Sequence, residues 1–193
     1  SKTVLGAEHR EGELGAEDAQ LIAFARELQT EAAMFLVGNS TDLPKFDGTL
    51  YLADSAKHGE YSPAVHKQLL LDVIAREQPE QVVFLHSSYG WDLAPRVAVA
   101  LKAAQVSEVI GVDGGLPVVP VCNAKLRRTI KPTTATTVLT LQAGAFGLDD
   151  EPTGTPTVVA VDTDATGKVQ CTGYEAAKIE GVDLTKATII VSA

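Results

Sequence analysis

The sequence predicts a doubly wound α/β protein with a mainly parallel sheet flanked by helices, and with antiparallel strands added in the C-terminal half. Two observations predict this class. Short apolar runs alternate with segments of helical periodicity over residues 3–104, an order that gives parallel strands joined by right-handed crossovers. Beyond residue 104 strand-like runs follow one another across Gly, Pro and Thr-rich turns, which is typical of antiparallel or edge strands.

The first half of the chain contains four expected strands and three expected helices. The strands are apolar runs at residues 3–7, 33–37, 49–53 and 81–86, as expected for buried strands. The helices are expected at residues 17–28, 63–77 and 93–104. Ser62-Pro63 marks the clearest helix start, because a hydroxyl can cap a helix and Pro fits its first position. Asp92 is expected to cap the third helix after a loop at residues 87–90.

The second half contains only strand candidates. Short runs occur at residues 108–111, 118–122, 124–130 and 137–141, with weaker ones at 153–161 and 168–173 and a closing apolar run at 188–191. Turn-forming residues separate them, and no helical pattern intervenes. These runs are therefore predicted to extend the sheet as antiparallel or edge strands.

Composition excludes several classes of function. The 193 residues suit one domain, and 45% of them are hydrophobic, so a sizeable core is possible. The net charge of −9 opposes binding to nucleic-acid phosphates and to anionic membrane surfaces. No apolar run approaches the ~20 residues that span a bilayer. No signal-peptide pattern precedes the first strand, so we expect a cytoplasmic protein.

The sequence lacks the usual signatures of a self-sufficient active site. Cys122 and Cys171 are far apart without CxxC spacing, and the four histidines are scattered, so no metal site is predicted. The loop at residues 8–15 has no GxGxxG pattern, and its acidic side chains would repel a phosphate. We therefore predict that the chain itself is not catalytic.

Several residues at the carboxyl end of the predicted sheet have two interpretations. His86 is a structural histidine or a catalytic base, and the pattern favours the first. Ser87 and Ser88 are ordinary loop residues or ligands of an anion. Trp91 is a core residue or an interface anchor, and the arginines at 127–128 lie on a solvated strand face or contact an acidic partner.

Four segments resemble motifs of the electron transfer flavoprotein α subunit family. These are VLGAEH with Gly12 and Leu14, SYGWDLAPRVA at 88–98, VLTLQAGAF at 138–146 and LTKATIIVS at 184–192. In the same order, these four segments are similar to the family motifs AEH…G.L, S.GRDLAPRVAA, VLTVRPGAF and L..A.IVVSGGRG. Trp91 stands where the family usually has Arg, and residues 142–143 are Gln-Ala in place of Arg-Pro. The family's GGRG and its FAD-binding domain are expected after residue 193.

The resemblance implies that residues 1–193 form this family's N-terminal domain, with a Rossmann-like (adenine nucleotide α-hydrolase-like) fold. In the family, FAD is held mostly by the C-terminal domain and AMP by the β subunit. No FAD, AMP or metal ligand is therefore assigned in this chain. The domain is expected to be a scaffold of a heterodimer that carries electrons from flavoprotein dehydrogenases, such as the acyl-CoA dehydrogenases of fatty acid β-oxidation, towards a quinone reductase.

The resemblance, together with charged and aromatic side chains at a helix entrance, also suggests a partner surface. Its expected members are Tyr89, Trp91, Asp92, Arg96 and Arg128. One alternative is a free-standing adenine-nucleotide-binding protein that uses the crevice near residues 86–88. Another is an interaction module that lost its flavin domain.

Overall fold

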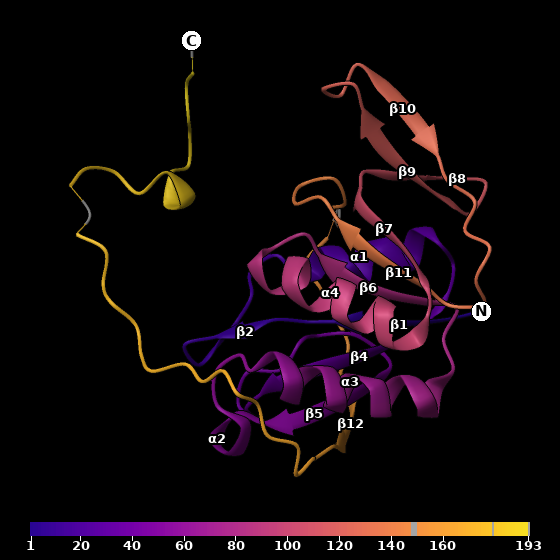
Figure 1. Cartoon of the computed structure of the whole chain (residues 1–193). Coiled ribbons are helices and arrows are strands. Elements are labelled where there is room, and N and C mark those ends of the chain that lie inside the picture. The colour runs from indigo at the N-terminus through magenta and orange to yellow at the C-terminus, as the bar shows by residue number, and fades with distance from the viewer. Residues whose placement is uncertain (148–149, 179, 193) are drawn as a thin grey trace.

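A sheet of seven parallel strands forms the centre of the computed structural model, which describes residues 1–147, 150–178 and 180–192 (Figure 1). In spatial order the strands are β12 (Thr157–Ala160), β5 (Thr49–Asp54), β4 (Glu31–Gly38), β1 (Lys2–Gly6), β6 (Gln81–Leu85), β11 (Thr137–Leu141) and β7 (Ala104–Val109). Every neighbouring pair in this order is parallel. The predicted α/β class is confirmed.

Helices cover both faces of this sheet. Helix α1 (Ala19–Glu27) packs on one face, while α3 (Pro63–Glu77) and α4 (Ser88–Leu101) pack on the other. Successive strand residues alternate between the two cores: Val4 lies with α3 and α4, and Leu5 lies with α1. Both faces are therefore buried, which explains why the strands are continuous apolar runs. The remaining short elements are β2 (His9–Arg10), β3 (Glu13–Leu14), α2 (Ser55–His58) and the 3-10 helix η1 (Leu184–Lys186).

A three-stranded antiparallel arm projects from the body (Figure 1). It consists of β8 (Gly111–Asp113), β9 (Leu116–Val121) and β10 (Leu126–Thr129). This arm connects β7 to β11, two parallel neighbours whose crossover is usually a helix. The prediction of antiparallel strands near 118–122 and 124–130 is confirmed.

The prediction that residues 137–141 form an antiparallel or edge strand is wrong. β11 is parallel to both of its neighbours, lies between β6 and β7, and is buried along its whole length. The sequence suggested otherwise because no helix precedes this strand. A crossover made of β-strands brings the chain back in the parallel direction just as a helix would.

Other strand predictions in the second half also need correction. The expected strand at 108–111 is divided between β7 and β8, and β7 begins at Ala104, which the sequence assigned to the preceding helix. Residues 168–173 and 188–191 form no strand. Ile189, Ile190 and Val191 are exposed and belong to none of the strand pairings in the described part of the chain.

Candidate functional site

The crevice at the carboxyl ends of β1 and β6 is the position where doubly wound sheets usually bind ligands. The chain builds β4 and β5 to one side of β1 and then places β6 on the other side, which makes this a topological switch point. Glu8 follows β1, and Ser87 follows β6. The Ser87 hydroxyl donates a hydrogen bond to the Glu8 carboxylate and accepts one from the Gly90 N–H, at 3.2 Å.

Ser87 is therefore the N-cap of α4, and the predictions that residues 87–90 form a loop and that Asp92 caps the helix are wrong. The helix starts five residues earlier than expected, because the Ser87 side chain satisfies the Gly90 N–H and Gly90 allows a close approach to β6. Pro95 consequently lies inside the helix.

Two carboxyl groups, the half-buried Glu8 and the buried Asp18, lie close together at this edge of the sheet. Asp18 is 2% exposed, and its Oδ2 accepts a hydrogen bond from the Glu8 N–H at 3.1 Å. Burial raises the pKa of Asp18 to about 8, and burial also raises the pKa of Glu8. Ser87 already holds the Gly90 N–H at the helix start, so this N–H is not available to a phosphate, and an ionised Glu8 beside it would repel one. The sequence interpretation missed Asp18, since an acidic residue before a helix usually lies in solvent.

His86 has a structural role in this arrangement. Its Nδ1 is hydrogen-bonded to Thr140 Oγ1 at 2.9 Å, and its backbone N–H donates to the Leu141 carbonyl at 2.7 Å. Both bonds join the end of β6 to the end of β11. Of the two interpretations of this residue, the geometry supports the structural histidine. Ser88 is exposed as the first residue of α4.

Three of the predicted partner residues belong to one network between α3 and α4. The rings of Tyr61, His66 and Tyr89 pack edge to face, with centroids 5.0 to 5.6 Å apart. The Tyr89 hydroxyl lies 3.0 Å from His66 Nδ1, and the Tyr61 hydroxyl donates to Asp92 at 2.8 Å. Arg96 pairs with the same Asp92 carboxylate at 3.1 Å. Tyr89 is directed inwards, whereas Asp92 and Arg96 carry the network to the surface.

Trp91 lies on the outer face of α4 and is 67% exposed. Pro95 and Val99 follow it at intervals of four residues, so the three side chains share one face of the helix. Val99 is 79% exposed, and Pro95 is exposed as well. Of the two interpretations of Trp91, the core residue is therefore excluded. We call these three residues the α4 outer face.

Arg128 lies apart from this helix, on β10. All four residues of that strand are exposed, and it is the outer strand of the antiparallel arm. Figure 1 shows the arm as a projection separate from α4. The structure thus brings Tyr89, Asp92 and Arg96 together, places Trp91 beside them on the same helix, and leaves Arg128 on another element.

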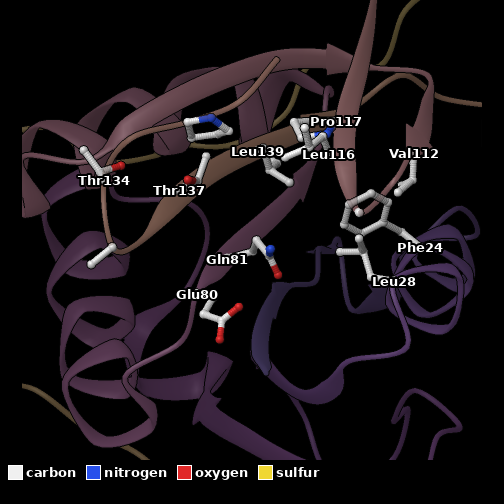
Figure 2. Close-up of a pocket in the computed structure, with 13 residues that line it drawn as sticks. Phe24, Leu28, Glu80, Gln81, Val112, Leu116, Pro117, Thr134, Thr137 and Leu139 are labelled. Carbon is white, nitrogen blue, oxygen red and sulfur yellow. The ribbon is translucent and has the colours of Figure 1, made fainter. Parts of the chain in front are cut away.

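A hollow of about 230 Å³ with mixed polar and apolar walls lies at the opposite, amino end of the sheet (Figure 2). α1 contributes Phe24 and Leu28, the arm contributes Leu116 and Pro117, and β11 contributes Leu139. No local pattern in the sequence predicts this hollow, because its walls come from segments that are distant along the chain.

Two other kinds of site have no counterpart in the described part of the chain. No group of three or more His, Cys, Asp and Glu side chains is arranged to hold a metal ion. Within the same ranges, no helix has the length and apolar character needed to cross a bilayer.

The buried His66 predicts a specific dependence of stability on pH. His66 is 4% exposed, and burial lowers its pKa from 6.5 to about 4. Between pH 6.5 and about pH 4 the unfolded chain binds a proton at His66 that the folded chain does not bind. The free energy of unfolding therefore decreases as the pH falls through this range. The expected loss is about 3 kcal/mol across that interval.

Urea unfolding of the native chain and of His66→Phe at several pH values tests this contribution. In the variant, the free energy of unfolding should no longer fall with pH through the protonation of His66. The plots of this free energy against pH for the two proteins should therefore converge and then cross on acidification. Curves that stay parallel from pH 6.5 to pH 4 would show that His66 keeps an ordinary pKa.

The fold and its crevice define the class of protein: a doubly wound α/β domain without a phosphate-binding loop. Residues 3–183 match the family described as electron transfer flavoprotein domain, and the chain belongs to this family. The chain is similar to the electron transfer flavoprotein subunit alpha of Bacillus subtilis (strain 168). The two are 26% identical over 206 aligned residues, which cover 99% of this chain and 63% of that relative. The predicted family is thus confirmed, and the chain spans less than two thirds of the relative's length.

Proposed function

We propose that this chain is the N-terminal scaffold domain of an electron transfer flavoprotein α subunit. In this role it pairs with a β subunit and supports a separate FAD-binding domain. The observation that carries the proposal is the similarity to an α subunit over 99% of this chain, together with the family match over residues 3–183. The domain itself is proposed to perform no catalysis.

The parent protein is proposed to act in the cytoplasm as an electron carrier. It would accept electrons from flavoprotein dehydrogenases, including acyl-CoA dehydrogenases, and pass them towards a quinone reductase. The Ser87 cap and the Glu8 carboxyl group beside it support a scaffold role, because they disfavour a diphosphate at the usual cofactor position. FAD is therefore proposed to bind outside this domain, and AMP to bind in the β subunit.

The α4 outer face is the proposed main contact with the β subunit. Aromatic residues dominate the energetics of protein interfaces, and Trp91 presents its ring to solvent with Pro95 and Val99 beside it. The Asp92–Arg96 pair provides a polar rim next to these side chains. Arg128 is proposed as a second, separate contact through the arm.

Replacing Trp91 and Val99 by Ser tests the proposed contact. Removal of a buried aromatic anchor typically costs about 2 kcal/mol or more, so the double variant should bind the β subunit at least tenfold more weakly. Binding is measured by calorimetry between the purified chain and its β subunit. Folding should be unaffected, because both side chains are exposed.

The matched control is Val182→Ser, which removes an equally exposed apolar side chain from the C-terminal segment. The control should bind the β subunit like the native chain. Equal affinities for all three proteins would exclude the α4 outer face as the contact. Arg128→Glu, tested alone, determines whether the arm contributes independently.

A further inference from the structure

A hollow with basic walls lies where the chain after β12 passes the beginning of α3. Its volume is about 380 Å³. Three cationic side chains line it: Lys67 from α3, Arg96 from α4, and Lys168 from the passing segment. No Asp or Glu is among its described lining residues, although the whole chain carries a net charge of −9. Arg96 is paired with Asp92, so it is the two lysines that give the hollow a local charge opposite to that of the protein.

The segment that closes the hollow is held in place on both sides. Asp162 accepts hydrogen bonds from Lys57 and from His58 of α2. Further on, the Tyr174 hydroxyl donates to Glu60 at 2.6 Å. Between these two attachments Gly167 lies against the start of α3.

The backbone at Gly167 lies close to the beginning of α3. A methyl group on Gly167 would lie 2.5 Å from Ser62 Oγ and 3.6 Å from the Ala64 side chain. The backbone at 166–168 therefore lies against the first turn of the helix, and Lys168 is placed on the same hollow as Lys67.

The donors around the hollow suit a tetrahedral oxyanion. Lys67 and Lys168 supply two ammonium groups, each able to donate several hydrogen bonds. The Ser62 side chain makes no capping hydrogen bond to α3, so its hydroxyl is free to donate into the hollow. Arg96 uses Nε and Nη2 to hold Asp92, which leaves Nη1 for another acceptor.

From these residues we infer that the basic hollow binds the phosphate group of a small molecule. A phosphate alone is much smaller than the space present, so the hollow also accommodates an organic remainder. The site is distinct from the acidic switch-point crevice, and the inference does not depend on the proposed electron-transfer role. The same chemistry is provided by free phosphate and by a phosphate monoester, and the test separates these two sources.

The test follows backbone amide signals by NMR while inorganic phosphate, AMP or adenosine is added at constant ionic strength. Saturable shifts at residues 62–67 and 166–169 are expected with phosphate and AMP, and not with adenosine. Tighter binding of AMP identifies a phosphate monoester as the ligand, whereas equal affinities identify the phosphate group alone. Adenosine binding as tightly as AMP would overturn the inference.

Charge variants of the lysines provide the matched controls. Lys67→Glu and Lys168→Glu should each weaken binding at least tenfold, and Lys67→Gln and Lys168→Gln should weaken it several-fold. Lys131→Glu, an exposed lysine outside the hollow, should leave the affinity unchanged. The inference is wrong if phosphate causes no shift at these amides, if chloride causes the same shift, or if Lys131→Glu weakens binding as much as Lys67→Glu.

Discussion

Gly90→Ala is expected to destabilise the domain by at least ~3 kcal/mol, beyond the usual range for overpacking. An ideal Cβ on Gly90 would lie 1.9 Å from the Leu85 carbonyl oxygen and 3.0 Å from the Phe84 Cβ. The obstructing oxygen belongs to the backbone of β6, so it cannot rotate away. The helix start must therefore move off the sheet.

A competing effect has the opposite sign but is smaller. Gly90 lies inside α4, where replacing Gly by Ala normally stabilises a helix by about 1 kcal/mol. The clash prevails because moving the first turn of α4 also breaks the Gly90 N–H bond to Ser87 and the Ser87 contact with Glu8. The α4 outer face would be displaced with it.

Chemical unfolding of the native chain, Gly90→Ala and Gly111→Ala measures this effect. A Cβ on Gly111 would meet no atom within 4 Å, so this control should change the free energy of unfolding by less than about 1 kcal/mol. A Gly90→Ala protein as stable as the control would mean that α4 does not approach β6 this closely.

The sequence was sufficient to predict the strands that are buried on both faces of the sheet. The strands containing Val4, Met34 and Val82 are buried on both faces, so their apolar runs identify them without knowledge of their neighbours. The direction of β11 could not be predicted in this way. It depends on the path of the arm between residues 110 and 136, and the antiparallel pairing of β9 with β10 is unrelated to how β7 and β11 pair.

The sequence predicted where the candidate site lies but did not predict which side chains form it. The end of β6 was expected to lie at the ligand edge of the sheet, and it does. Asp18 was missed because its burial depends on a turn that brings its carboxyl group to the Glu8 N–H, ten residues away. The exposure of Trp91 could be settled only once the start of α4 was known, since moving a helix start by five residues changes which side chains occupy its first turns.

Asp18→Asn is expected to make the domain markedly more stable than the native chain in alkaline solution. The folded chain holds Asp18 at a pKa of about 8, and the ordinary value is 3.8. Between these values the folded state keeps a proton that the unfolded state releases, so native stability falls as the pH rises. Four pH units at about 1.4 kcal/mol each give a loss on the order of 5 kcal/mol, a large part of a typical total.

The asparagine variant removes this dependence while it keeps the local structure. Its amide oxygen can still accept the hydrogen bond from the Glu8 N–H, and its neutral side chain has no charge to bury. Free energies of unfolding measured from pH 4 to pH 9 should therefore be much flatter for Asp18→Asn. The gap between the two proteins should widen until about pH 8 and then stay constant.

Asp113→Asn is the matched control, because it makes the same chemical change at an exposed carboxylate of β8. This variant should follow the native pH curve. If Asp18→Asn also follows the native curve, Asp18 is ionised throughout, and two close carboxylates must then be stabilised by a bound cation or by water reaching the crevice. The same measurement therefore decides whether Asp18 is neutral or charged at physiological pH.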